Sequence, residues 1–191
     1  MILATQNAHK VHEFGQILEG VDLRPLPDGV EMPPEDGVAF AENALIKARA
    51  VRAATGSEVI ADDSGIEIAA LDGRPGVRSA RYAGEEASDG ENLTKALRDL
   101  DAAGGPADAR YVCVIAYIDG QGAEHLFEGF CAGRMIQNPR GDGGFGYDPA
   151  FVPEETGESD QRTMAEMTPE EKHAISHRGK AARKLAEYLE N

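Results

Sequence analysis

Two adjacent aspartates, Asp62 and Asp63, are the residues in this sequence best placed to do chemistry. They follow the apolar run Val59–Ala61, which is typical of the end of a buried strand, and they precede Ser64 and Gly65. Neighbouring residues of a strand point to opposite faces, so we expect one carboxylate to bond within the scaffold and the other to project toward a ligand at the strand end. A projecting carboxylate can bind Mg²⁺ or act as a general base. The alternative is a polar turn, because Asp, Ser and Gly all favour turns.

The polar turn Thr5–Lys10 separates the strand-like Met1–Ala4 from an apolar stripe with helical spacing. The stripe consists of Val11, Phe14, Ile17 and Leu18. A helix N-terminus presents free N–H groups that suit a phosphate, and Lys10 would add a positive charge there. The turn lacks the glycines of a P-loop, so an ordinary N-cap by Thr5 or Asn7 explains it equally well.

The segment Asn138–Pro149 combines glycines with two aromatic residues, Phe145 and Tyr147. Glycine lets the backbone approach a ligand closely, and an aromatic ring can stack on a purine. A structural hinge is the alternative. We favour a ligand, because two rings in a glycine loop are costly to leave exposed.

The residues Thr168–Glu171 predict the start of the last helix, with a cap and a proline at its first position. Lys172, His177 and Arg178 follow and fit a clamp for a phosphate or a base, although a solvated basic face is the alternative. His173 and His177 have a spacing that can chelate zinc, but the HEXXH motif is absent and no third ligand is apparent. We therefore do not favour a zinc site.

The remaining elements predict an α/β fold with a mixed sheet. Further strands are expected at Val21–Leu26, Ile66–Leu71, Arg110–Ile118 and Ala123–Ile136, and helices at Val38–Thr55 and from Ser88 to about Asp101. The turn Asp119–Gly122 makes the last two strands a hairpin. The acidic loop Glu31–Gly37 contains the candidate metal ligands Glu35 and Asp36, with a solvated loop as the alternative.

Composition limits the classes of protein to consider. The chain has 191 residues, which suits one domain or one domain with two lobes, and 34 acidic against 19 basic residues give a net charge of −15. This charge argues against nonspecific binding to nucleic acid or to an anionic membrane. We expect no membrane span and no secretory signal, hence a cytoplasmic protein, with Cys113 and Cys131 as buried free thiols.

Taken together, the motifs resemble the inosine triphosphatase family, the non-canonical purine nucleoside-triphosphate pyrophosphatases, over almost the whole chain. The segments that carry the resemblance are Thr5–Lys10 with Glu13, Glu35–Gly37, Phe40–Ala44, Ala61–Gly65, Pro75–Tyr82, Gly144–Pro149, Glu171–Lys172 and Ser176–Arg178. Each segment is short, and their order along the chain makes the match specific.

The resemblance implies hydrolysis of ITP, dITP and XTP to the monophosphate and pyrophosphate, with Mg²⁺ as cofactor. It also implies a homodimer and a single domain over residues 1–191, with an elongated α/β fold. In that fold, helices flank a mixed central sheet and a substrate cleft lies between two lobes. By the same resemblance, Asp63 is the general base and a metal ligand, and Glu35 is the second metal ligand. The substrate-binding residues would be Thr5, Gln6, Asn7, Ala8, His9 and Lys10 for the phosphates, Ser64, then Phe145, Gly146, Tyr147 and Asp148 for the base, and Lys172, His177 and Arg178 for the purine edge.

Two other functions are compatible with these motifs. One is a related pyrophosphatase for other bases, such as modified pyrimidines. The other is a module that binds or senses nucleotides without catalysis, against which the intact carboxylates Glu35 and Asp63 count, since a binder needs no base.

Overall fold

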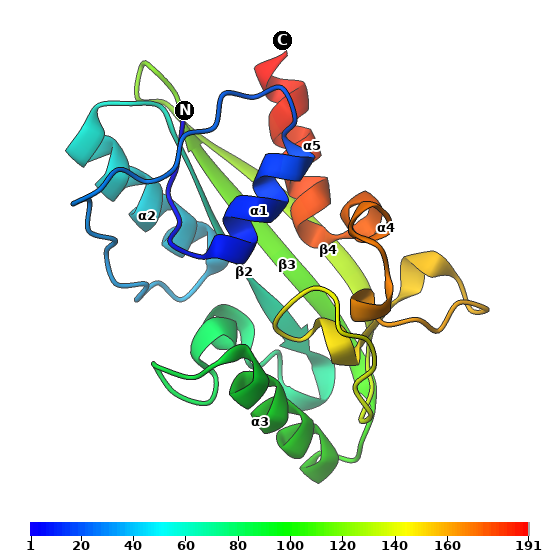
Figure 1. The fold of residues 1–191 in the computed structure, drawn as a ribbon. Helices are drawn as coiled ribbons and strands as arrows, with labels where there is room; N and C mark the ends of the chain where they lie inside the picture. Colours follow the sequence, from blue (N-terminus) through cyan, green and yellow to red (C-terminus); the bar gives the residue numbers. More distant parts are fainter. Residues whose placement is uncertain (191) are drawn as a thin grey trace. The chain divides into compact units, whose positions relative to one another are not determined.

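The computed structural model describes residues 1–190, and within them it has the expected α/β architecture with a mixed sheet (Figure 1). The strands are β1 (Ile2–Leu3), β2 (Val59–Ile68), β3 (Ala107–Ile118), β4 (Glu124–Met135) and β5 (Phe151–Pro153). They form one sheet in the order β1-β2-β3-β4-β5, in which β1 is parallel to β2 and β4 is antiparallel to β5.

The α-helices are α1 (Ala8–Ile17), α2 (Phe40–Thr55), α3 (Asp89–Ala102), α4 (Pro169–Ile175) and α5 (His177–Leu189). Short 3₁₀ helices lie at Ala69–Leu71, Gly76–Arg81, Asp148–Ala150, Glu154–Thr156 and Met164–Glu166. None of the helices in the described part of the chain is long and apolar enough to cross a membrane.

The chain forms two compact units. The first unit combines Met1–Asp63, Cys113–Gly129 and the chain from Arg178 onward, and the second combines Ser64–Val112 with Phe130–His177.

In the first unit, helices cover both faces of the sheet. Ile60 on β2 packs in one cluster with Phe14 of α1 and Ala182 of α5, the two helices that Figure 1 shows side by side. Its neighbour Ala61 packs in another cluster with Ala48 of α2. This alternation follows from the strand geometry, which turns successive side chains to opposite faces. In the part of β2 that belongs to the first unit, Ile60 and Asp62 therefore face α1 and α5, and Ala61 and Asp63 face α2.

The second unit is built around one apolar cluster under α3. Leu100 of α3 packs with Ile66 of β2, Tyr111 of β3 and Phe151 of β5. The helix begins at a capping box, as expected from the sequence. The Glu91 amide donates to the Ser88 hydroxyl, and the Ser88 amide donates to the Glu91 carboxylate. Both cysteines are buried free thiols, as predicted.

Three local predictions are wrong. The segment Val21–Leu26 forms only an isolated bridge between Ile2 and Arg24, because the proline that follows has no N–H for a sheet ladder. The strand expected at Ile66–Leu71 is not a separate one, since β2 continues through Asp62–Gly65, the alternative turn, to Ile68, and Ala69–Leu71 form a 3₁₀ helix. The last predicted helix is two helices, because Ser176 has extended backbone angles (φ −65°, ψ 153°).

The close approach of β4 and β5 yields a first prediction. A Cβ on Gly133 would lie 2.4 Å from the Val152 carbonyl oxygen and 2.5 Å from the Phe151 ring. We expect Gly133→Ala to lower the free energy of unfolding by about 1–3 kcal/mol in urea titrations, because two strands must shift.

Gly15→Ala is the matched control, because Gly15 lies within α1 and a Cβ there meets no atom within 4 Å. It should raise the free energy of unfolding by roughly 0.5–1 kcal/mol, since alanine favours a helix interior. Equal effects of the two substitutions would contradict the close packing at Gly133.

Candidate active site

Asp62 and Asp63 lie side by side on β2, and both are almost fully buried, at 1% and 4% exposure. By the alternation of the strand, Asp62 faces α1 and α5, and Asp63 faces α2. A buried carboxylate requires hydrogen-bonding or charged partners, so each face must supply its own set. The partners of Asp62 differ from those of Asp63, and this difference gives the two aspartates different roles.

Asp62 is held by two cations. Its Oδ2 lies 2.9 Å from the Lys10 Nζ at the start of α1 and 3.4 Å from the Arg178 Nη2 at the start of α5. Burial disfavours the charge of Asp62, but the positive charges of Lys10, Arg178 and Lys47 outweigh that penalty and hold its pKa well below the usual value. A carboxylate that stays ionised in this way is a poor proton acceptor, so Asp62 fits the scaffold role.

Arg178 also bonds the Glu13 carboxylate on α1. Burial disfavours the guanidinium charge, yet Asp62 and Glu13 together raise its pKa above the ordinary value. The cluster Lys10–Asp62–Arg178–Glu13 therefore joins β2, α1 and α5 through charges that are each compensated.

Asp63 has a different environment on the α2 face. The Asn43 amide donates to its Oδ2 at 3.0 Å, and the Lys47 Nζ lies 3.8 Å from its Oδ1. Asn43 and Lys47 are four residues apart, so they project from the same face of α2. Burial raises the pKa of Asp63, and the negative charge of Glu35 adds to the rise, while Lys47 opposes it. Asp63 therefore binds a proton more strongly than an ordinary aspartate, as a general base requires.

The loop that carries Glu35 is anchored to the start of α2. The Lys47 Nζ donates to the Glu35 Oε1 at 2.5 Å. Two backbone amides of the loop also donate to α2 side chains, Gly37 to the Asn43 Oδ1 and Val38 to the Glu42 Oε2, both at 2.8 Å. Glu35 and Asp63 are thus two carboxylates that share one lysine.

These residues fit a magnesium ion. Mg²⁺ prefers oxygen ligands and in nucleotide enzymes usually takes one or two carboxylates together with substrate phosphates. Glu35 and Asp63 are close enough for the charge of one to raise the pKa of the other, so a cation would relieve their repulsion. Within residues 1–190, no three His, Cys, Asp or Glu side chains form a metal cluster, but two carboxylates suffice when phosphates complete the shell. Asp36, the other metal candidate in this loop, is exposed.

Thr5–Asn7 precede α1 as expected, Ala8–Lys10 form its first turn, and Asn7 caps the helix. Its Oδ1 accepts the His9 amide at 2.9 Å and the Lys10 amide at 3.3 Å. Thr5 is half-buried and accepts the Asn7 amide at 3.2 Å, whereas Gln6, Ala8 and His9 are exposed. The N-cap interpretation is confirmed, and Lys10 extends from this turn to Asp62. Ser64, half-buried, follows Asp63 on β2.

A second cluster lies in the second unit, around the buried Asp148. Its Oδ1 accepts the Tyr111 hydroxyl at 3.0 Å, and its Oδ2 accepts the Lys172 Nζ at 2.7 Å and the Phe145 amide at 2.9 Å. The Lys172 Nζ also lies 4.9 Å from the centroid of the Phe145 ring, and the Tyr111 ring stacks on His177 at 4.6 Å. The structure therefore brings Phe145, Asp148, Lys172 and His177 together in the second unit.

The glycine loop is shaped by Asp148 and Tyr147. Gly144 has φ +67°, and a Cβ on it would lie 2.1 Å from the Asp148 Oδ2, so only glycine fits there. Tyr147 is buried and its hydroxyl donates to the Ser79 carbonyl at 2.7 Å. The Gly146 amide donates to the Asp89 carboxylate at 3.2 Å. The loop is thus an ordered part of the second unit.

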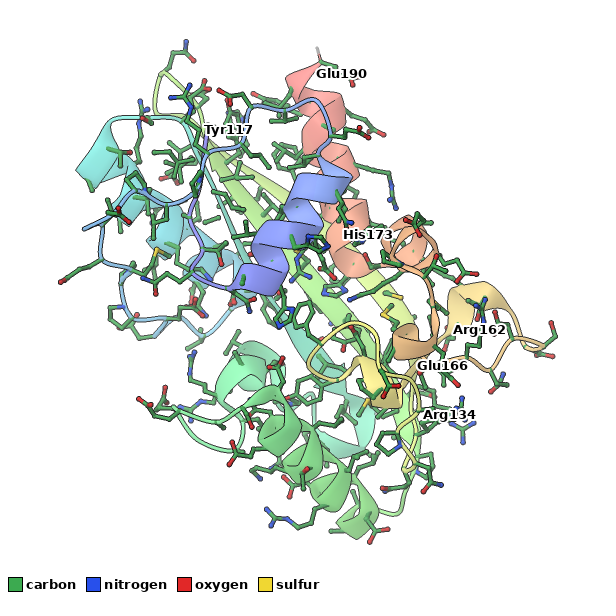
Figure 2. All side chains as sticks on the ribbon, viewed as in Figure 1. Tyr117, Arg134, Arg162, Glu166, His173 and Glu190 are labelled. Atoms are coloured by element: carbon green, nitrogen blue, oxygen red, sulfur yellow. The ribbon has the colours of Figure 1, made fainter. Side chains whose placement is uncertain are left out.

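Some site residues are not where the sequence predicts. Lys172 lies on α4 in the second unit, whereas Arg178 lies on α5 in the first, where it bonds Asp62 and Glu13. His173 is on α4 (Figure 2), so it does not share a helix with His177. Arg134, whose role the sequence does not indicate, is exposed on β4 (Figure 2).

Sequence reasoning missed four residues of these clusters: Glu13, Asn43, Lys47 and Tyr111. Asn43 and Lys47 carried a usable signal, because two polar residues on the apolar face of a helix need buried partners. Glu13 is part of the motifs that carry the resemblance, but nothing local indicated the bonds that Glu13 and Tyr111 form, because their partners lie far away in the sequence.

Comparison with known proteins supports the resemblance. The family model described as "Ham1 family" matches residues 1–188. The dITP/XTP pyrophosphatase of Geobacillus kaustophilus is 46% identical over all of this chain and 94% of that protein, and the one of Shigella flexneri is 44% identical over all of this chain and 98% of that protein. The structure of a HAM1 protein from Coxiella burnetii has a TM-score of 0.87 and 42% identity, covering 98% of this chain and 96% of its own. This chain belongs to the Ham1 family.

Proposed function

We propose that this chain is a nucleoside-triphosphate pyrophosphatase that hydrolyses ITP, dITP and XTP to the monophosphate and pyrophosphate, and so removes them from the nucleotide pool. The observation that carries the proposal is the buried Asp63, which Asn43 and Lys47 hold beside Glu35. The relatives support it, since the proteins of Geobacillus kaustophilus and Shigella flexneri named above are dITP/XTP pyrophosphatases.

In the proposed reaction, Asp63 accepts a proton from water, and the water oxygen attacks the α-phosphorus. The bond from that phosphorus to the bridging oxygen breaks, and pyrophosphate leaves with the electron pair. Glu35 and Asp63 would hold Mg²⁺, which offsets negative charge on the phosphates when bound. Lys10 and Lys47 add positive charge.

The phosphates are proposed to contact the turn Thr5–Lys10 and Ser64. Side chains there, rather than only the helix N-terminus, have to bind them, because Asn7 already occupies the His9 and Lys10 amides. The positive charge of Lys10 lies next to Asp62, which keeps the ammonium in a fixed position.

The base is proposed to bind at the Asp148 cluster, with the Phe145 ring stacked on the purine and Gly146 to Asp148 around it. A 6-oxo purine presents an acceptor to which Lys172 and His177 can donate hydrogen bonds. Arg178 is proposed to contact substrate groups next to the purine edge. Adenine presents an amino donor at the same position, so donors of the protein would stay unpaired, and that mismatch is costly. The homodimer, the cytoplasmic location and the single domain over residues 1–191 stay predictions.

The first experiment measures pyrophosphate release from ITP, XTP, GTP, ATP and a set of modified pyrimidine triphosphates, with Mg²⁺ and with EDTA. We expect release from ITP and XTP that EDTA abolishes and added Mg²⁺ restores, with little release from GTP or ATP. Release mainly from modified pyrimidine triphosphates would favour the related pyrophosphatase. Binding of nucleotides without any release would favour a sensing module.

Asp63→Asn tests the base. The amide cannot accept a proton from water, so kcat for ITP should fall by about 100- to 10,000-fold. The fold should persist, because burial already disfavours the charge of Asp63. Circular dichroism and urea titration check the fold.

Glu67→Gln is the control on the same strand, where Glu67 pairs with Arg110 at the surface. Its turnover should equal that of the wild type. Turnover in Asp63→Asn close to that of this control would exclude Asp63 as the base.

Lys172→Met tests recognition of the base. The loss of a charged donor should lower the ratio of kcat/KM for ITP over ATP by roughly 10- to 100-fold, since hydrogen bonds to charged groups are worth about 1.5–3 kcal/mol. Lys95→Met is the control, because Lys95 forms a surface ion pair with Asp99 in the same unit. An unchanged ratio in Lys172→Met would remove Lys172 from base recognition.

A further inference from the structure

We propose that Asn43 is a positioning residue for the reaction proposed above: its single amide group fixes both the carboxylate of Asp63 and the loop that carries Glu35. The inference rests on the proposed function. It assigns a task to a side chain that touches neither the water nor the phosphates in that scheme.

Asn43 is fully buried, at 0% exposure, on the second turn of α2. A buried side-chain amide is costly unless its donors and acceptor are bonded. Both ends are bonded here, since the Nδ2 donates to the Asp63 Oδ2 at 3.0 Å and the Oδ1 accepts the Gly37 amide at 2.8 Å. The bonds to Asp63 and Gly37 therefore explain why a polar residue, Asn43, occupies this buried position of α2.

The bond to Asp63 fixes the rotation of its carboxylate. With Oδ2 held by Asn43, Oδ1 is the atom nearer to the Lys47 ammonium, at 3.8 Å. Lys47 in turn bonds Glu35 at 2.5 Å. Asn43 and Lys47, one helical turn apart, thus set the orientation of both carboxylates from one rigid face of α2.

The bond to Gly37 fixes the loop at short range. A Cβ on Gly37 would lie 2.6 Å from the Asn43 Oδ1 and 2.9 Å from the Glu42 Cβ, so the backbone packs directly against the helix. Glu35 is two residues away from that contact. A shift of Asn43 would therefore move both carboxylates relative to each other.

The chemistry selects an amide at this position. The group must donate to a carboxylate and accept from a backbone N–H, and Asn does both. Asp could still accept the Gly37 amide, but it could not donate to Asp63 when ionised. Asn43→Asp and Asn43→Ala therefore separate the two tasks.

The experiment measures kcat and KM for ITP with Mg²⁺ in the wild type, Asn43→Asp, Asn43→Ala and Glu42→Ala. Glu42→Ala is the matched control, because Glu42 anchors the same loop through Val38 and is not bonded to Asp63 by any contact described above. We expect kcat to fall about 10- to 100-fold in both Asn43 variants, as for other residues that orient a ligand of a reacting centre. KM for ITP should change little, and Glu42→Ala should keep its kcat.

Two readouts do not depend on turnover. Calorimetry with a non-hydrolysable α,β-imido analogue of ITP in EDTA should give the same Kd for the wild type and both Asn43 variants. Amide hydrogen exchange by NMR should show faster exchange of Gly37 in Asn43→Ala but not in Asn43→Asp. Urea titration checks that each variant is folded, with the near-isosteric Asn43→Asp as the safeguard should Asn43→Ala unfold.

The outcomes are separable. Full kcat in Asn43→Asp, or equal losses in Glu42→Ala and Asn43→Ala, would reduce Asn43 to a loop anchor and overturn the proposal. Unchanged exchange of Gly37 in Asn43→Ala would overturn it as well. A wild type that releases no pyrophosphate would instead overturn the proposed function on which it rests.

Discussion

The burial of two adjacent carboxylates on β2 is the constraint on which the first unit depends. An unpaired buried charge costs several kcal/mol, and removal of one partner from a buried ion pair costs about 3–5 kcal/mol. Asp62 and Asp63 point to opposite faces, so helices on both faces have to supply partners. Lys10 and Arg178 do so from α1 and α5, and Asn43 and Lys47 do so from α2. The two carboxylates can therefore be buried on β2 only because these three helices pack against the strand and supply their partners.

The partners also give the two aspartates opposite proton affinities. Asp62 has the charges of Lys10, Arg178 and Lys47 around it, and its pKa falls despite complete burial. Asp63 has to share Lys47 with Glu35, so burial prevails and its pKa rises. Neighbouring carboxyl groups whose environments push their pKa values apart are a common arrangement in acid–base chemistry. Here the two pKa values are shifted in opposite directions because Asp62 and Asp63 are adjacent in a strand and face opposite sides of the sheet.

Local signals in the sequence predict local structure well. The apolar stripe and Gly56 identify α2, and the pair Ser88 and Glu91 marks the start of α3. The errors arise where distant residues decide. Asp-Asp-Ser-Gly has the composition of a turn, but its carboxylates find cations on both faces and remain in a strand, because tertiary contacts outweigh local preference. The break at Ser176 likewise has no marker such as glycine or proline next to it, so the sequence predicts one helix where there are two.

The same limit applies to the site. Sequence motifs select Lys10, Asp63, Asp148, Lys172 and Arg178, but they do not indicate which of them pair, and Arg178 pairs with Asp62 rather than joining Lys172. The pairing explains how a chain with a net charge of −15 can suit a polyanionic substrate. Its general field repels anions, but Lys10, Lys47, Lys172 and Arg178 are each bonded to carboxylates in or beside the core, where a low dielectric strengthens short-range attraction. In the function proposed above, attraction for the substrate would come from these fixed cations, whereas the net negative charge of the chain disfavours nonspecific binding of nucleic acid.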